Sequence, residues 1–265
     1  MSDAAPAPGI AEFVAPEQWS RIDFISDLHL APGTPRTFAA WAAWLRETPA
    51  DAVFILGDLF DAWVGDDARH DGFEAECSGV LAEAGRSRSL AFMCGNRDFL
   101  AGRAWLDACG MAALADPTTL VAFGRRVLLT HGDALCLADT EYQRYRALVR
   151  SPAWQAMALA LPLAERRRRA AQLRHASELR LADGALAGAS SDIDLAAAAG
   201  WMRLADAPVM VHGHTHRPAS SAVAPGCMRH VLSDWDCDTA APGQARGQVL
   251  ALTRDGFERI EVARA

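Results

Sequence analysis

The stretch Phe24-Ile-Ser-Asp-Leu-His-Leu30 is the most informative part of this sequence, because a short apolar run leads directly into a carboxylate and an imidazole. Short runs rich in branched or aromatic side chains are typical of strands. Such a run ends in a polar motif four more times along the chain. The motifs are Gly57-Asp58 after residues 52–56, Gly95-Asn96-Arg97-Asp98 after 90–94, His131-Gly132-Asp133 after 127–130, and Gly213-His214-Thr215-His216 after 209–211. Sites in open α/β sheets lie at the carboxyl ends of strands, so these motifs are predicted to meet.

The apolar spacing between the strands predicts a layered α/β fold. Residues 37–47 and 72–84 carry apolar side chains at helical spacing, and strands that alternate with helices are covered by them. After residue 115 the strands lie closer together, and Gly124-Arg125 between two runs favours a hairpin. Later runs at 229–232, 248–253 and 257–262 add strands. We predict two mixed sheets packed face to face with helices outside, a four-layer αββα sandwich.

Residues 137–199 interrupt this alternation and are predicted to form a helical insert or lid. Tyr142, Tyr145 and Val149 recur at helical spacing, and Asp194 is placed to cap a later helix. An apolar stretch at 154–163 is followed by four arginines, residues 166–169. That pairing suits an interfacial helix for a lipid with an anionic head group. It equally suits a packed helix with a solvated arginine face, which composition alone favours.

Composition sets the broad class of protein. The 265 residues, 51% of them hydrophobic, predict one domain over 21–265, with an Ala- and Pro-rich flexible tail over 1–20. A net charge of −7 argues against nucleic acid as a partner. The six cysteines show no C-x-x-C spacing, and neither a signal peptide nor an apolar run of about 18 residues is evident, which favours the cytoplasm. Nothing in the sequence indicates an obligate protein partner.

The polar motifs favour a pair of divalent cations. Carboxylate and amide oxygens mixed with imidazoles, without a thiolate, suit Mn²⁺, Mg²⁺, Fe²⁺ or Zn²⁺. Two cations about 3.5 to 4 Å apart need one ligand that reaches both. We predict that Asp58 is this bridge.

The five motifs, in this order, resemble the pattern of the calcineurin-like metallophosphoesterases, and the fit spans roughly residues 21–218. The resemblance implies that one ion takes Asp27, His29, Asp58 and His216, and the other takes Asp58, Asn96, His131 and His214. It also implies that water shared by two ions, with Mn²⁺ the first candidate, attacks phosphorus in line. The catalytic residues implied are Asp58, Asn96, Arg97 and His131.

Arg97 stands where the general family pattern has a histidine. A histidine acid matters when the leaving group is a basic alkoxide, whereas a phosphate with a second pKa of about 6 departs without a proton. Arg97 offers a permanent forked charge to phosphate oxygens instead, which favours cleavage of a phosphoanhydride. The alternative is a surface arginine paired with Asp98.

Longer strings resemble one branch of that family, the UDP-2,3-diacylglucosamine pyrophosphatases of lipid A biosynthesis. They include Gly57-Asp-Leu-Phe-Asp-Ala-Trp63, Gly95-Asn-Arg-Asp-Phe99 and Leu161-Pro162-Leu163. The branch implies release of UMP and 2,3-diacylglucosamine 1-phosphate (lipid X) from a lipid-linked sugar nucleotide, by an enzyme bound peripherally to the cytoplasmic face of the inner membrane. Implied substrate contacts are Asn96, Arg97, Asp139, Ser177 and His214.

The match to this branch is weaker at Leu181 and Gly184, where its members have Asn and Lys, and Arg174 or Arg180 could replace these contacts. Two alternatives stay open: an enzyme of the same family acting on a soluble nucleotide, and a scaffold without catalysis.

Overall fold

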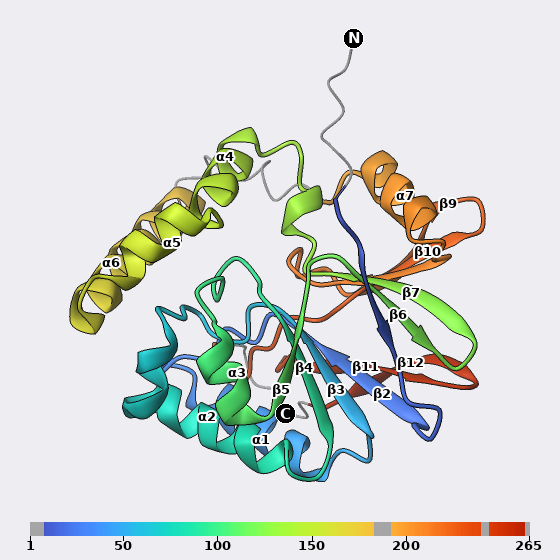
Figure 1. The fold of residues 1–265 in the computed structure, drawn as a ribbon, viewed down its shortest axis with the longest axis horizontal. Coiled ribbons are helices and arrows are strands. Elements are labelled where there is room, and N and C mark those ends of the chain that lie inside the picture. The colour runs from blue at the N-terminus through green and yellow to red at the C-terminus, as the bar shows by residue number, and fades with distance from the viewer. Residues whose placement is uncertain (1–7, 183–191, 240–243, 263–265) are drawn as a thin grey trace.

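A computed structural model describes residues 8–182, 192–239 and 244–262, with the side chains of 175–182 excepted. Two six-stranded sheets pack face to face, with helices on both outer surfaces (Figure 1). The predicted four-layer αββα architecture is therefore confirmed.

The first sheet, called here the β2 sheet, has the order β12-β11-β2-β3-β4-β5. Four of its strands are parallel: β2 (Arg21–Ile25), β3 (Ala52–Leu56), β4 (Ser89–Met93) and β5 (Met111–Leu114). The antiparallel strands β11 (Gln248–Thr253) and β12 (Gly256–Glu261) extend it beside β2. Because the parallel strands all end at one edge, this sheet presents the motifs at 27–29, 58 and 96–97 together.

The second sheet, called here the β7 sheet, has the order β1-β6-β7-β8-β10-β9. Its strands are β1 (Ala11–Val14), β6 (Thr118–Ala122), β7 (Arg125–Thr130), β8 (Val209–His212), β9 (Ala219–Ala224) and β10 (Cys227–Val231). β6 and β7 form the predicted hairpin, with Phe123 and Gly124 at positive φ in the turn. β7 and β8 run parallel, so the motifs at 131 and 214–216 also lie at one edge.

Three apolar cores hold the layers together. Phe24, Phe54 and Leu120 lie between the two sheets. The outer face of the β2 sheet packs on α1 (Pro35–Glu47), α2 (Gly72–Ala84) and α3 (Arg103–Cys109) through Trp41 and Trp105. The outer face of the β7 sheet is covered by α7 (Leu195–Leu204). Asp194 caps α7 as predicted, by accepting the N–H of Ala197 at 2.8 Å.

The prediction of a flexible tail over residues 1–20 is wrong for its described second half. Ala11–Val14 forms β1, which pairs in parallel with β6 at the edge of the β7 sheet. Phe13 packs edge-on against Phe54 with ring centroids 5.3 Å apart, and Trp19 is buried. Prolines and alanines made the segment look unstructured, but its two aromatic side chains fill the edge of the core between the sheets.

Three of the helices between β7 and β8 project from one end of the sandwich (Figure 1): α4 (Thr140–Val149), α5 (Pro152–Leu159) and α6 (Leu163–Ala182). The arginine run at the start of α6 is largely paired within the protein. Arg166 is buried and forms an ion pair with Asp67, Arg167 pairs with Asp71 and Glu74, and the two remaining arginines pair with Glu165. The packed-helix interpretation of the run therefore fits the structure better than a free basic surface.

No helix in the described ranges combines the length and apolar character needed to cross a bilayer.

Candidate metal centre

The backbone at the strand ends has an uncommon conformation that aims polar side chains into one site. Non-glycine residues rarely adopt positive φ, and those that do are found in turns and are enriched at functional sites. Five of the seven predicted ligands have φ between 48° and 64°: Asp27, His29, Asp58, His214 and His216. Each lies within four residues of the end of a parallel strand, so the turn that leaves the sheet directs the side chain toward the cluster.

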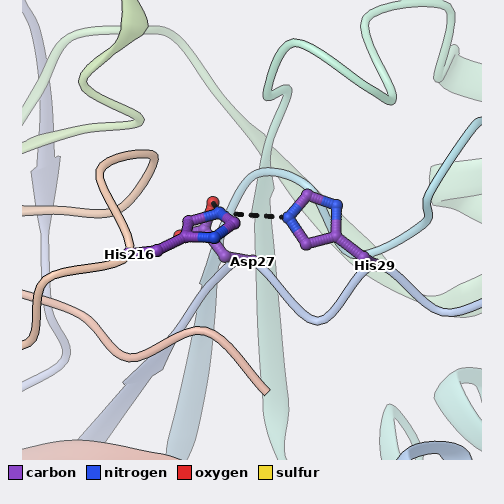
Figure 2. Close-up of side chains that lie close together, drawn as sticks. All are labelled: Asp27, His29 and His216. Carbon is purple, nitrogen blue, oxygen red and sulfur yellow. Dashed lines mark hydrogen bonds and ion pairs between the residues drawn. The ribbon is translucent and has the colours of Figure 1, made fainter. Parts of the chain in front are cut away.

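Asp27, His29 and His216 form the first ligand group. His29 Nε2 lies 3.2 Å from His216 Nε2, and His216 Nε2 lies 3.4 Å from Asp27 Oδ1. Figure 2 shows the two imidazoles pointing toward each other beside Asp27. Their donor atoms all lie within 4.8 Å of one another, which is close enough for one cation to contact all three. The backbone N–H of His214 donates to Asp27 and orients its carboxylate.

Asn96, His131 and His214 form the second group. Asn96 Oδ1 lies 3.0 Å from His131 Nε2 and 2.9 Å from His214 Nδ1. His131 Nδ1 faces the carbonyl oxygen of Leu56 at 2.9 Å. A proton on Nδ1 is needed to satisfy that carbonyl, so in neutral His131 the lone pair of Nε2 faces the cluster, as a metal ligand requires.

Asp58 lies between the two groups. Its Oδ2 is 4.0 Å from His29 Nε2, and its Oδ1 is 3.7 Å from His131 Nε2. One carboxylate oxygen thus faces an imidazole of the first group, and the other faces an imidazole of the second group. Asp27, Asp58 and His131 also bring their donor atoms within 4.8 Å of one another. The predicted ligands converge as two groups that share a carboxylate.

The charges in this buried cluster perturb one another strongly. Burial, with the nearby carboxylates of Asp98 and Asp27, raises the pKa of Asp58 to about 7. Although burial alone lowers the pKa of His131, the carboxylates of Asp58, Asp27 and Asp133 raise it to about 9. Burial lowers the pKa of His29 to about 3 and that of His214 to about 4.

These properties fit a divalent cation pair. Asn96 Oδ1 is an acceptor, and it faces Nε2 of His131 at hydrogen-bond distance. Once that nitrogen has lost its proton, two lone pairs face each other, an arrangement that a cation between them would stabilise. Buried carboxylates without counter-ions are costly, and metal coordination is one way in which proteins compensate them. Oxygen and imidazole donors without sulfur are those of a Mn²⁺, Mg²⁺, Fe²⁺ or Zn²⁺ site.

Two glycines permit this close packing. A Cβ on Gly95 would overlap Asp58 Oδ1, and a Cβ on Gly213 would overlap the side chains of Asp27 and Ser26. Only glycine lets these motif backbones approach the carboxylates so closely.

Arg97 lies beside the centre and is partly buried. Its backbone N–H donates to Asp58 Oδ1 at 2.8 Å, while its side-chain Nε is buried without a hydrogen-bond partner in the described chain. Asp98 instead accepts the backbone N–H groups of Gly95 and Leu59. The structure therefore does not show the alternative of an Arg97–Asp98 ion pair, and the guanidinium keeps donor capacity for a ligand.

The remaining predicted contacts lie further along the insert. Asp139 caps α4 by accepting the N–H of Tyr142 at 2.9 Å. Arg174 forms an ion pair with Asp61. The side chains of Ser177, Arg180 and Leu181, and all of Gly184, lie outside the described part of the chain.

A second set of polar residues surrounds the centre, and reasoning from the sequence assigned it no functional role. Asp133 is buried and accepts hydrogen bonds from Tyr142 and Arg146 of α4. Tyr142, Arg146 and Arg150 recur every four residues, which places them on one face of the helix. This four-residue spacing of polar side chains is the signal in the sequence from which the set could have been predicted. Asp66 also has a structural role, because it accepts N–H groups of Gly102 and Trp105 at the start of α3.

The chain is similar to proteins of known family. The calcineurin-like phosphoesterase family model matches residues 20–218, a range that contains all five motifs. A UDP-2,3-diacylglucosamine hydrolase of Bordetella pertussis is 43% identical over 245 residues, covering 89% of this chain and 93% of that protein. One from Xanthomonas oryzae pv. oryzae is 40% identical over 251 residues, covering 91% and 98%. Among solved structures, the E. coli phosphoesterase Yfce aligns with a TM-score of 0.43 at 14% identity, over 92% of this chain and 100% of its own.

Proposed function

This chain belongs to the calcineurin-like phosphoesterase family, and from that premise we propose that it hydrolyses the pyrophosphate bond of UDP-2,3-diacylglucosamine. The products are UMP and 2,3-diacylglucosamine 1-phosphate (lipid X), an intermediate of lipid A biosynthesis. The substrate is supported by relatives at 40–43% identity that carry the name UDP-2,3-diacylglucosamine hydrolase. The chemistry is supported by one observation above all: two ligand groups share Asp58 beside an arginine whose Nε has no partner in the described chain.

Seven side chains hold the two cations in this proposal. Asp27, His29 and His216 serve one cation, Asn96, His131 and His214 serve the other, and Asp58 serves both. When bound, the cations supply Lewis-acid charge to the phosphoryl oxygens and acidify water for the attack. Mn²⁺ is the proposed native ion, because mixed carboxylate, amide and imidazole donors accept it readily.

Arg97 acts on the substrate rather than on the cations. Water attacks the α-phosphorus, and the bond from that phosphorus to the bridging oxygen of the anhydride breaks. The leaving phosphate of the lipid product carries the electron pair away without needing a proton, because its second pKa is about 6. The guanidinium of Arg97 can form a bidentate hydrogen bond with two phosphate oxygens and stabilise the negative charge that develops there. Asn96 and His214 complete the phosphate contacts from the metal centre.

The helical insert houses the acyl chains. Several of its apolar side chains are exposed, including Leu148, Met157, Leu159 and Leu173. Exposed apolar residues gathered on one segment are typical of a surface for lipid or for a partner. Asp139 and Ser177 are the proposed sugar contacts on the insert. Because the proposed substrate carries two acyl chains, we propose that the same surface binds the enzyme peripherally to the cytoplasmic face of the inner membrane.

The test is hydrolysis of a substrate panel by the purified protein supplied with Mn²⁺. The panel holds UDP-2,3-diacylglucosamine, a dinucleoside polyphosphate and a generic phosphodiester, with Asp58→Asn as the control for contaminating activity. We expect turnover of the diacylated sugar nucleotide at least 100-fold above the other two, and loss of that turnover in Asp58→Asn. Faster turnover of the soluble nucleotide would overturn the substrate assignment, and full activity of Asp58→Asn would overturn the two-cation centre.

A further inference from the structure

Asp133 connects the metal centre to the first helix of the insert. It is the third residue of the His131 motif, and its side chain is buried. Tyr142 donates its hydroxyl to Asp133 Oδ2 at 2.6 Å, and Arg146 donates Nε to the same oxygen at 2.8 Å. A terminal nitrogen of Arg150 lies 3.5 Å away. Tyr142, Arg146 and Arg150, called here the α4 row, therefore converge on a carboxylate two residues from a predicted ligand.

Arg150 also reaches the neighbouring motif. The same terminal nitrogen donates to the carbonyl oxygen of Gly95 at 3.0 Å and to that of Cys94 at 3.3 Å. Gly95 directly precedes Asn96, whose side-chain oxygen lies at the centre of the second ligand group. The guanidinium of Arg150 thus contacts both the loop that carries Asn96 and the turn that follows His131.

Tyr142 makes the third connection. Its ring stacks on the imidazole of His214, with centroids 6.0 Å apart and planes inclined by 28°. The α4 row therefore supports all three residues of the second group. It hydrogen-bonds to Asp133 two residues after His131, Arg150 donates to the carbonyl before Asn96, and the Tyr142 ring stacks on His214. None of the contacts described for α4 among residues 8–182, 192–239 and 244–262 falls on Asp27, His29 or His216.

This asymmetry has a physical consequence for cation binding. Residues that hydrogen-bond to ligands or fix their backbone typically change metal affinity about 10- to 100-fold when they are replaced. Contacts confined to one ligand group act on one cation position. We propose that the α4 row holds Asn96, His131 and His214 in register, so that the helical insert governs occupancy of the second cation position. The inference rests on the proposed two-cation centre and makes Arg150 and Asp133 positioning residues.

The experiment compares Mn²⁺ binding to wild type and Arg150→Met, with Arg144→Met as the matched control. Arg144 is an exposed arginine of the same helix. Stoichiometry is measured by elemental analysis after equilibration at fixed free Mn²⁺, and electron paramagnetic resonance separates a spin-coupled pair from a single ion. We expect wild type and Arg144→Met to hold two ions with a coupled spectrum. Arg150→Met should bind its second ion about 10- to 100-fold more weakly and show a single-ion spectrum at low loading. Arg150→Lys should recover part of the affinity, because an ammonium can still donate to the Gly95 carbonyl.

The outcomes separate this inference from the proposed function. If wild type holds fewer than two ions, the two-cation centre fails. If wild type and Arg150→Met both hold two ions with equal affinity, only the role of the α4 row is overturned. Should Arg150→Met not fold, judged by circular dichroism, Tyr142→Phe decides, because it removes one donor to Asp133 and keeps the ring. Weaker binding of the second ion in Tyr142→Phe supports the inference, and unchanged binding of both ions contradicts it.

Discussion

At the scale of single residues, two features characterise this site: the left-handed backbone of five predicted ligands, and the Arg97 Nε, which has no hydrogen-bond partner among the described residues. Asp27, His29, Asp58, His214 and His216 all adopt the left-handed conformation, which costs of order 1–3 kcal/mol each for non-glycine residues. The surrounding structure imposes it: the N–H of His29 donates to the carbonyl of Asp58, and the N–H of Asp27 donates to that of Gly57. These strained turns bring the metal-donor atoms of separate motifs into one cluster. A relaxed backbone at the same strand ends would direct these atoms away from one another.

Arg97 gives the prediction at this scale. Arg97→Met removes the forked charge but keeps the backbone N–H that donates to Asp58. We expect kcat for the pyrophosphate substrate to fall about 100-fold or more, comparable to the loss of one transition-state donor. Bound Mn²⁺ should stay at the wild-type level, because the Arg97 Nε has no hydrogen-bond partner among the described residues and so holds no predicted ligand in place. Steady-state kinetics and elemental analysis on the same preparations test this. Equal loss of metal and turnover would assign Arg97 to the cation site instead.

At the scale of elements, several contacts attach the helical insert to the sandwich, and two of them are formed by the α4 row and by Arg166. The α4 row lies on the turns after β4 and β7, and Arg166 of α6 lies on the loop after β3. Arg166 is 7% exposed, forms a bidentate ion pair with Asp67, and donates to the carbonyls of Val64 and Leu161. A guanidinium buried this far is retained because several acceptors compensate its lost hydration. The insert is thereby held beside the loop that carries Asp58.

Arg166→Met should loosen this second attachment. Hydrogen bonds to charged groups contribute about 1.5–3 kcal/mol each, so we expect a loss of about 2 kcal/mol or more in local stability. Hydrogen exchange of the α6 backbone over residues 163–174 should accelerate, while exchange in β2 and β3 stays at the wild-type rate. Arg168→Met is the matched control, because Arg168 is exposed and pairs only within its own helix in the described contacts. Unchanged exchange in α6 would show that Arg166 does not hold the insert.

At the scale of the whole molecule, the metal centre joins the two sheets. The β2 sheet supplies Asp27, His29, Asp58 and Asn96, and the β7 sheet supplies His131, His214 and His216. Cations bound there act on the folded state alone, because the unfolded chain does not bring these side chains together. The protonation of the same groups then sets how strongly the cations bind.

The pH dependence of cation binding follows from the raised pKa values of three predicted ligands, Asp58, His131 and His216. In the cation-free protein the pKa of Asp58 is about 7 and that of His131 about 9, so both residues hold protons that a cation must displace. Raising the pH through 7 and then toward 9 removes these competing protons, so Mn²⁺ affinity should rise. Each displaced proton contributes about tenfold per pH unit, or about 1.4 kcal/mol. His29 and His214, with pKa values near 3 and 4, are already neutral and add nothing in this range.

Calorimetric titration with Mn²⁺ at pH 6, 7.5 and 9, in buffers of different ionisation enthalpy, measures both affinity and proton release. We expect release of roughly one to two protons per chain near pH 7, falling toward zero above pH 9. Asp58→Asn should lose the part of the pH dependence near 7. An affinity for Mn²⁺ that stays constant between pH 6 and 9 would contradict the protonation states assigned to these ligands.

The sequence by itself determined the strands that end in polar motifs, and through them the fold class and the predicted ligands. Those features are local: an apolar run such as residues 52–56 specifies a buried strand, and parallel strands place Asp58 and Asn96 at one edge. Only the tertiary structure decided where β1 pairs, because two aromatic residues in an Ala- and Pro-rich segment carry little strand signal. It also decided that Arg166 pairs inward and that Arg97 Nε has no partner among the described residues, because ion pairs depend on distances in the folded chain and not on spacing in the sequence. The protonation of Asp58 was also decided by the tertiary structure. It depends on burial beside Asp98 and Asp27, and these residues come together only when the sheets have packed.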